Sequence, residues 1–194
     1  MEQSAFGPLT KQNIVVFLGD IFERRGDEEY LGEPVTMAEH MLQSAHFAEQ
    51  ANEPDIVVVA ALLHDIGHFT SEFGMFSMDD TEDRYHETAG ADILRAFFPE
   101  LVVDCVRHHV AAKRYLCATS PSYVEELTEA SRQRLGEQGG PMNQDEVRAF
   151  ELQPYYWEAV KLRSFDEMAR VKGMRTPELE RFRPYLMACM RPAR

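Results

Sequence analysis

The residues with the clearest chemical potential are an adjacent histidine and aspartate, His64 and Asp65, followed by His68. They come at the end of the apolar run of residues 57–63. Two polar side chains at the end of a buried helix cost free energy unless something pairs them. Because an imidazole and a carboxylate on one short segment can bind the same cation, the pair predicts a metal site.

Further histidines and a late aspartate extend the candidate site. His40, His86 and His109 fall at helix ends or on apolar-flanked helix faces, and Asp166 lies on a later helix. Imidazole and carboxylate ligands together are typical of first-row transition metals. Four histidines and two aspartates exceed the needs of one ion, but they match two ions about 3.5–4 Å apart that share a carboxylate.

Two cations and a second histidine lie close to these candidates in the sequence. Lys113 follows His109 by one helical turn, and Arg163 precedes Asp166 by three residues, so both cations can reach a ligand bound at the same site. His108 and His109 are adjacent, and successive helical residues point about 100° apart, so only one of them can face the metals.

The apolar periodicity predicts that helices position these side chains. Residues 10–25 carry one apolar stripe that stops at Gly26. Thr36 and Glu39 have the spacing of a capping box that opens the helix carrying His40. The apolar run 57–63 could be a buried strand on its own, but Pro54 at its start favours a helix.

Later segments show similar signals. We expect a loop over 70–84, a helix from His86, another from Pro99 past His109, and one that begins at Ser120–Pro121 and ends at Gly136. Asn143 with Glu146, Pro154, and Thr176–Pro177 are predicted to open the last helices. We find no repeat or domain boundary, so we expect one all-α domain over residues 1–194.

Composition narrows the classes of function. The 194 residues are 44% hydrophobic and 27% charged, which is ordinary for a globular domain. A net charge of −13 argues against nucleic-acid binding, which needs a basic face. There is no long apolar span and no signal-peptide pattern, and three cysteines without paired spacing suit a reducing cytoplasm. We therefore expect a cytoplasmic protein without membrane partners, and the oligomeric state stays open.

The order His40, His64–Asp65, Asp166 resembles the H…HD…D signature of the HD-domain superfamily, an all-helical metal-dependent fold. His86 and His109 resemble the additional ligands of its dinuclear subset. The segments Tyr30-Leu-Gly-Glu33-Pro-Val-Thr36 and His109-Val-Ala-Ala-Lys113-Arg-Tyr115-Leu are similar to the PhnZ-type oxygenases, the PhnZ- and TmpB-like 1-hydroxyphosphonate oxygenases, and the similarity spans residues 10–172.

This resemblance implies an HD-domain helical bundle that holds two iron ions as a mixed-valent Fe²⁺/Fe³⁺ pair. One iron would be bound by His40, His64, Asp65 and Asp166, and the other by His86 and His109, with Asp65 as the bridge. Of the two adjacent histidines, His109 is the one that aligns with the family segment. Relatives often carry two aspartates at the last ligand position, where this chain has Asp166 and Glu167.

The implied enzyme is an oxidoreductase, a dioxygenase that incorporates oxygen into a single donor. It would cleave the C–P bond of a (1R)-1-hydroxy-2-aminoethyl- or 1-hydroxy-2-(trimethylammonio)ethylphosphonate with O₂. Hydrogen abstraction at C1 on the di-iron site would give inorganic phosphate and either glycine or glycine betaine. The small zwitterionic phosphonate and O₂ are thus the expected partners.

The resemblance also assigns roles around the metals. Lys113, Ser131 and Arg163 would hold the phosphonate, and we expect His68 to hydrogen-bond the substrate rather than ligate a metal. Tyr30 can ligate the substrate-binding iron when the site is empty, and Glu33 helps hold its loop closed over substrate.

Two other functions share parts of this pattern. An HD phosphohydrolase of a nucleotide or phosphoester would also use His40, His64, Asp65 and Asp166. A non-catalytic helical binding or sensor module needs no bound iron. The Tyr30–Glu33 loop and the second pair of histidines favour the oxygenase, but the choice between an amino and a trimethylammonium substrate stays open.

Overall fold

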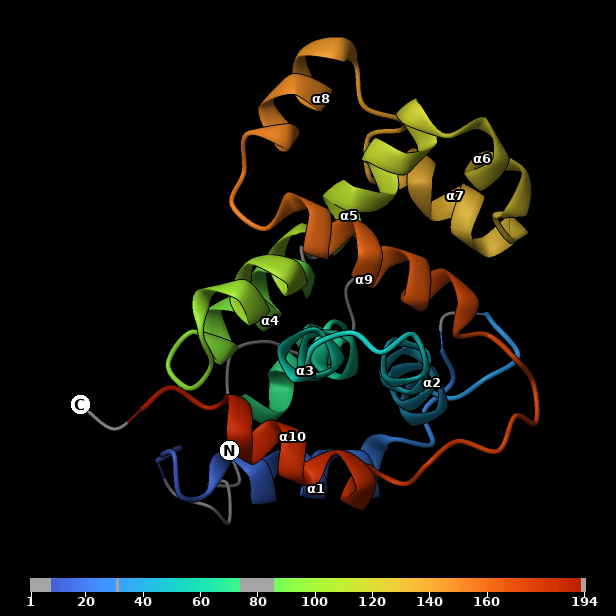
Figure 1. Cartoon of the computed structure of the whole chain (residues 1–194). Helices are drawn as coiled ribbons and strands as arrows, with labels where there is room; N and C mark the ends of the chain where they lie inside the picture. Colours follow the sequence, from blue (N-terminus) through green and yellow to red (C-terminus); the bar gives the residue numbers. More distant parts are fainter. Residues whose placement is uncertain (1–7, 31, 74–85, 193–194) are drawn as a thin grey trace.

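The computed structural model describes residues 8–30, 32–73 and 86–192, and helices make up most of this part of the chain (Figure 1). Its extended pairing is confined to an isolated bridge between Glu29 and Thr36. The helices in chain order are α1 (Ile14–Arg25), α2 (Met37–Gln50), α3 (Asp55–Leu63), the 3₁₀ helix η1 (Ile66–Phe73), α4 (His86–Leu94), α5 (Glu100–Thr119), α6 (Pro121–Glu126), α7 (Glu129–Glu137), α8 (Gln144–Glu151), α9 (Tyr156–Met168) and α10 (Leu179–Cys189). The all-α prediction is confirmed.

Helix α3 lies at the centre of the molecule. It packs against α2, α5, α9 and α10, and every residue from Val57 to Leu63 is buried (Figure 1). A helix that is apolar all round belongs in a core. Because the run ends inside the protein, His64 and Asp65 emerge in the interior rather than at the surface.

The first helix signals are confirmed. Helix α1 ends at Gly26, and α3 begins directly after Pro54. The Thr36 side chain accepts a hydrogen bond from Glu39 N, and the Glu39 carboxylate accepts one from Thr36 N, which completes the capping box of α2. This cap fixes the start of the helix that carries His40.

The single helix predicted from Ser120–Pro121 to Gly136 is wrong, because two helices cover this stretch. Helix α6 stops at Glu126, Leu127 turns to an extended backbone, and α7 starts after Thr128. The Thr128 hydroxyl accepts from Ser131 N at 3.0 Å and caps α7. Leu127 is buried in a small cluster with Tyr123 and Leu135, so tertiary packing stabilises the break.

Three other boundaries differ slightly from expectation. Helices α9 and α10 begin two residues after Pro154 and Pro177, and residues 70–73 of the expected loop belong to η1. The rest of that loop, from residue 74, lies outside the described residues.

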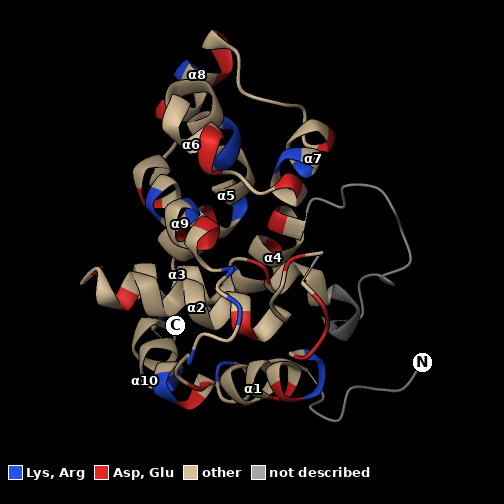
Figure 2. Ribbon diagram, turned by 90° about the vertical axis from the view of Figure 1, so that its right-hand side faces the viewer, with Lys and Arg blue, Asp and Glu red and all other residues tan. Residues whose placement is uncertain are grey.

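Helices α6, α7 and α8 form one end of the molecule, beside α5 and α9 (Figure 1). Acidic and basic residues are interspersed along them (Figure 2). A cluster of Ala112, Phe150, Ala159 and Val160 packs α8 against α5 and α9. Within the described ranges, no helix is long and apolar enough to cross a membrane.

Candidate metal centre

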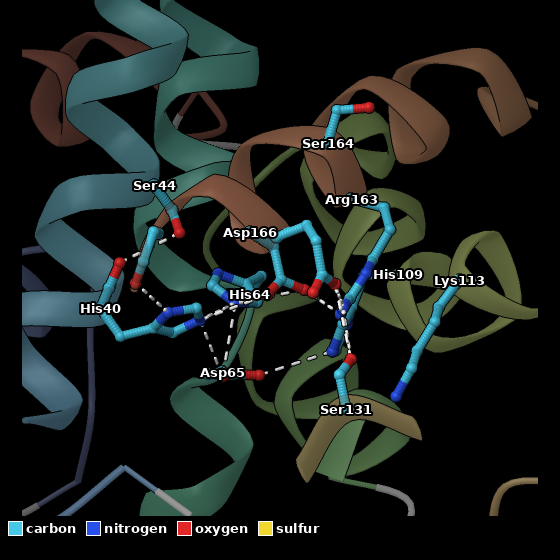
Figure 3. A network of polar contacts seen from close by, with 12 residues as sticks. His40, Ser44, His64, Asp65, His109, Lys113, Ser131, Arg163, Ser164 and Asp166 are labelled. Atoms are coloured by element: carbon cyan, nitrogen blue, oxygen red, sulfur yellow. Dashed lines mark hydrogen bonds and ion pairs between the residues drawn. The ribbon is translucent and has the colours of Figure 1, made fainter. Parts of the chain in front are cut away.

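The first group of candidate ligands comes from three helices. It consists of His40 on α2, His64 and Asp65 after α3, and Asp166 on α9, all of them buried (Figure 3). His40 Nε2 lies 3.0 Å from His64 Nε2 and 3.4 Å from Asp166 Oδ1. Asp65 Oδ2 lies 3.5 Å from His40 Nε2 and 3.3 Å from His64 Nε2. Four ligand side chains therefore converge on one point.

Hydrogen bonds to the backbone fix the tautomers of these histidines. His40 Nδ1 lies 2.8 Å from Ala169 O, and His64 Nδ1 lies 2.8 Å from Ala61 O. A carbonyl oxygen only accepts, so each Nδ1 carries a proton, and each ring presents a lone pair at Nε2 when it is neutral. The two Nε2 atoms, 3.0 Å apart, cannot hydrogen-bond each other in this state, and a cation beside them resolves the conflict.

The second group repeats this arrangement on the other side of Asp65. His86 Nε2 and His109 Nε2 lie 3.1 Å apart, and they lie 3.5 Å and 3.4 Å from Asp65 Oδ1. His109 Nδ1 donates to Val106 O at 2.7 Å, which again leaves its Nε2 as the acceptor. Asp65 thus turns one oxygen to each histidine pair, the geometry of a carboxylate that bridges two cations.

Two buried oxygens without a hydrogen bond support the fit of metal ions. Asp65 Oδ2 and Asp166 Oδ1 are buried and have no hydrogen-bond partner. Buried carboxylate oxygens normally have a partner or a metal. The mixture of imidazole nitrogens and carboxylate oxygens suits a first-row transition metal. The residues therefore fit a two-metal centre of the kind that the sequence predicts.

The carboxylates and the histidines of this centre shift one another's pKa values. Burial raises the pKa of the Asp65 carboxyl, but His64 and the other facing histidines outweigh it and hold that pKa well below its usual range. Burial lowers the pKa of His64, but the carboxylates of Asp65 and Asp166 outweigh it and raise that pKa to about 9. The carboxylates thus attract positive charge at His64 Nε2, where a metal ion competes with a proton.

His68 lies beside the second group. Its ring stacks on His86 with 4.2 Å between centroids, and its Nε2 lies 3.9 Å from Asp65 Oδ1. Burial first, then the neighbouring His86, lowers the pKa of His68 to about 3. The ligand atoms of Asp65, His68 and His86 lie within 4.8 Å of one another, so these three side chains could also hold a metal ion.

The adjacent histidines on α5 point to different surroundings. His109 is buried and faces Asp65, whereas the ring of His108 lies 6.1 Å from that of Phe150 in the cluster under α8. The structure therefore brings His109 to the centre and leaves His108 outside it.

The three predicted phosphonate-binding residues gather on one side of the centre (Figure 3). Arg163 is buried, pairs with Asp166 through Nη1, and has Nη2 3.5 Å from Ser131 Oγ. Lys113 is also buried and donates from Nζ to Gln138 at 3.2 Å. Burial first, then the nearby Arg163, lowers the pKa of Lys113 to about 8.

The segment before α2 covers the first metal position. Tyr30 is 3% exposed, and its ring stacks on His40 with centroids 3.8 Å apart. Burial, Asp65 and Asp166 raise the pKa of the Tyr30 phenol well above its usual value. Glu33 is 8% exposed and accepts from Thr128 Oγ1 at 2.6 Å, which ties this segment to α7.

Sequence reasoning missed Gln43 and Arg170. The Gln43 amide donates to Val171 O at 3.0 Å and accepts from Val171 N at 2.9 Å. Arg170 Nη2 lies 3.5 Å from Asp166 Oδ1, and Arg170 Nε lies 3.4 Å from Glu33 Oε1. Spacing could have indicated both, because Gln43 follows His40 by one turn and Arg170 follows Asp166 by four residues.

Comparison with known proteins places these residues in a family context. Residues 37–144 match the family model described as HD domain. The chain is 59% identical over 184 residues to a (1-hydroxy-2-(trimethylamino)ethyl)phosphonate dioxygenase (glycine-betaine-forming) of Leisingera caerulea, covering 95% of this chain and 94% of that protein. It is 38% identical over 177 residues to a hydroxymethylphosphonate dioxygenase of Gimesia maris, covering 91% of this chain and 88% of the relative.

Proposed function

The chain belongs to the HD domain family, and from this premise we propose that it is a dioxygenase that cleaves the C–P bond of 1-hydroxy-2-(trimethylammonio)ethylphosphonate. The observation that carries the proposal is the 59% identity, over 95% of the chain, to a relative named for that reaction. The buried cluster of four histidines and two aspartates supports it. We also propose that residues 1–194 act as a single domain of this type.

The reaction balances with O₂ as the only co-reactant. The C1–H and C1–P bonds break, one oxygen atom enters the new carboxylate of glycine betaine, and the other enters inorganic phosphate. The two hydrogens of the C1–H and hydroxyl groups leave as protons, one of which stays on phosphate at neutral pH. No external reductant is consumed in the net turnover.

For the metals we propose iron in a mixed-valent Fe²⁺/Fe³⁺ pair. His40, His64, Asp65 and Asp166 would hold one ion, and His86 and His109 would hold the other, with Asp65 as the bridge. Such a pair supplies one-electron chemistry towards O₂ and binds the substrate hydroxyl. The convergence of the Nε2 atoms in each histidine pair and the two carboxylates support this ligand set, since the carboxylates offset the repulsion between two cations.

Around the metals, Lys113, Arg163 and Ser131 would hold the phosphonate. A guanidinium and an ammonium bind an oxyanion strongly when buried, and the hydroxyl adds a donor. His68 would hydrogen-bond the substrate near the second metal. These groups would orient C1 and leave the cationic end of the substrate towards the Tyr30 segment.

Tyr30 and Glu33 would close the site over the substrate. Both are buried here, and the Glu33 carboxylate is a suitable neighbour for a quaternary ammonium. Excluding water protects the reactive centre from side reactions.

The test is phosphate release by the iron-loaded protein with and without O₂. We expect turnover of the trimethylammonium substrate only in the aerobic sample, and faster than turnover of the 2-amino analogue measured beside it. Unchanged release without O₂ would overturn the oxygenase and favour a phosphohydrolase. Faster turnover of the amino compound would overturn the proposed substrate.

A further inference from the structure

Glu167, the residue after the last candidate ligand, lies between the buried Arg163 and the partly buried Arg170. Its Oε2 pairs with Arg163 Nη2, and its Oε1 pairs with Arg170 Nη1. Arg170 Nη1 also donates to the backbone oxygen of Glu167 at 3.1 Å. One carboxylate thus contacts two cations, one on each side.

The oxygen that contacts Arg163 also meets two hydroxyl groups. Tyr123 OH donates to Glu167 Oε2 at 3.2 Å, and Ser131 Oγ lies 3.5 Å from the same oxygen. Arg163 Nε in turn donates to Tyr123 OH at 2.7 Å. Glu167 Oε2 therefore lies among donors from α6, α7 and α9, where an anionic oxygen is stabilised.

Two of these donors, Arg163 and Ser131, are the groups proposed above to hold the phosphonate. Two anions cannot share them without strong repulsion, which low-dielectric surroundings increase. An incoming phosphonate therefore competes with the Glu167 carboxylate for the same N–H and O–H groups.

We propose that Glu167 is a displaceable internal anion, which takes the place of a phosphonate oxygen at Arg163 and Ser131 and withdraws to Arg170 when an oxyanion binds. The phosphonate identity of the oxyanion rests on the proposed function, whereas the displacement does not. Glu167 is a positioning residue that keeps the buried Arg163 paired before the substrate arrives.

Arg170 is suited to receive the carboxylate. It already contacts Oε1 of Glu167, its side chain is 8% exposed, and it also pairs with Glu33 and Asp166. The negative charge of Glu167 stays paired throughout the exchange, so displacement leaves no buried charge alone. Because an oxyanion must first displace the Glu167 carboxylate, it binds less tightly than it would bind to Lys113, Arg163 and Ser131 without this competitor.

The test is calorimetric binding of inorganic phosphate to the metal-loaded protein and its Glu167→Gln variant. Glutamine keeps the shape but removes the competing charge, so we expect phosphate to bind about tenfold more tightly. A merely structural role for Glu167 predicts the opposite sign, because loss of the carboxylate would disorder Arg163. Equal or weaker binding by the variant overturns the proposal.

Glu49→Gln is the matched control. It also removes one negative charge, but Glu49 pairs with Arg181 and Tyr185 on α10, outside this network. We expect its phosphate affinity to match that of the original protein. A tenfold gain in this control as well would mean that net charge causes the effect, and it would overturn the proposal.

Glu167→Asp covers the case in which the glutamine variant does not fold. It keeps the charge, but it is one methylene shorter and draws the carboxylate away from Ser131 and Tyr123. We expect phosphate binding that is tighter than in the original protein, with a lower KM and a similar kcat for the phosphonate. No gain overturns the displacement, whereas a gain in phosphate binding without phosphonate turnover would overturn only the proposed function.

Discussion

At the scale of single residues, Asp65 decides how many cations the centre can hold. Its Oδ2 lies 3.3 Å from His64 Nε2, and its Oδ1 lies 3.4 Å from His109 Nε2, so one carboxylate serves both histidine pairs. The histidines depend in turn on carbonyl groups, since each donated Nδ1–H keeps a lone pair at Nε2. Backbone carbonyl groups of the surrounding helices thereby orient these rings so that Nε2 faces Asp65.

The adjacent histidines of α5 give a matched pair of variants. His109→Ala removes a ligand of the second metal, so we expect metal content to fall to about one ion per chain and activity to fall at least about 100-fold. His108→Ala removes a ring beside Phe150 and should keep both ions and most of the activity. Metal analysis and phosphate release check both variants. Full metal content in His109→Ala would contradict the assignment.

The lowered pKa of Lys113 predicts that kcat/KM depends on pH. Burial and Arg163 lower its pKa to about 8, so its ammonium is charged below that pH and loses its proton above it. A phosphonate binds the charged form, and we therefore expect kcat/KM to fall as the pH rises through about 8.

The control for this pH profile is a pair of methionine variants. Lys113→Met should have a lower kcat/KM that no longer falls as the pH rises through about 8. Lys161→Met removes a partner of Glu53 outside the centre, and its kcat/KM should still fall over this pH range. A falling limb that persists unchanged in Lys113→Met would show that another group titrates.

At the scale of elements, the centre depends on how α2 is fastened to the chain that follows α9. His40 donates to Ala169 O, and Gln43, one turn later, makes two hydrogen bonds to the backbone of Val171. These contacts join the element that carries the first ligand to the element that carries Asp166. The contacts thereby fix the position of His40 relative to Asp166, although these candidate ligands are 126 residues apart in the sequence.

Gln43→Met tests this fastening. Methionine fills a similar volume but leaves the N–H and C=O of Val171 without their partner, so we expect a loss of about 2 kcal/mol in the free energy of unfolding. Metal affinity should fall with it. Urea unfolding and metal titration measure both effects. Gln133→Met, on the exposed face of α7, should change stability by less than about 0.5 kcal/mol, and an equal loss there would contradict the account.

At the scale of the whole molecule, the sequence predicts the elements better than the contacts between them. The capping box at Thr36, Pro54 before α3 and Pro121 at the first position of α6 are local signals, and they mark the real helix starts. At Leu127 the only local signal for the break is Thr128, the cap of α7, and burial of the Leu127 side chain stabilises the break.

The same distinction applies to the candidate site. The histidines and aspartates indicate the metal cluster from the sequence alone, because such side chains have few roles other than metal binding when they are buried. The contacts of Glu167 with Arg163, Arg170, Tyr123 and Ser131 join three helices and a following segment. Helical spacing indicates the pairs within α9, but only the fold brings Tyr123 and Ser131 to them.

Metal removal should affect the stability of the whole domain. The candidate ligands lie on α2, α4, α5, α9 and the residues after α3. Chelation would leave two buried oxygens, Asp65 Oδ2 and Asp166 Oδ1, without a hydrogen bond or a metal. We expect Tm to fall by several degrees. A metal ion whose free concentration is about 100 times its dissociation constant stabilises the folded state by about 2.7 kcal/mol, and chelation removes this contribution. Calorimetry before and after chelation measures this, and an unchanged Tm would contradict a structural contribution of the metals.

We propose that O₂, not water, supplies the oxygen atoms that the two products gain. The most direct measurement is turnover of 1-hydroxy-2-(trimethylammonio)ethylphosphonate under ¹⁸O₂ in ordinary water, with mass analysis of both products. The account predicts one labelled oxygen atom in phosphate and one in glycine betaine. Phosphate without label under ¹⁸O₂, and with label when the turnover is run in H₂¹⁸O instead, would contradict it and identify a hydrolase.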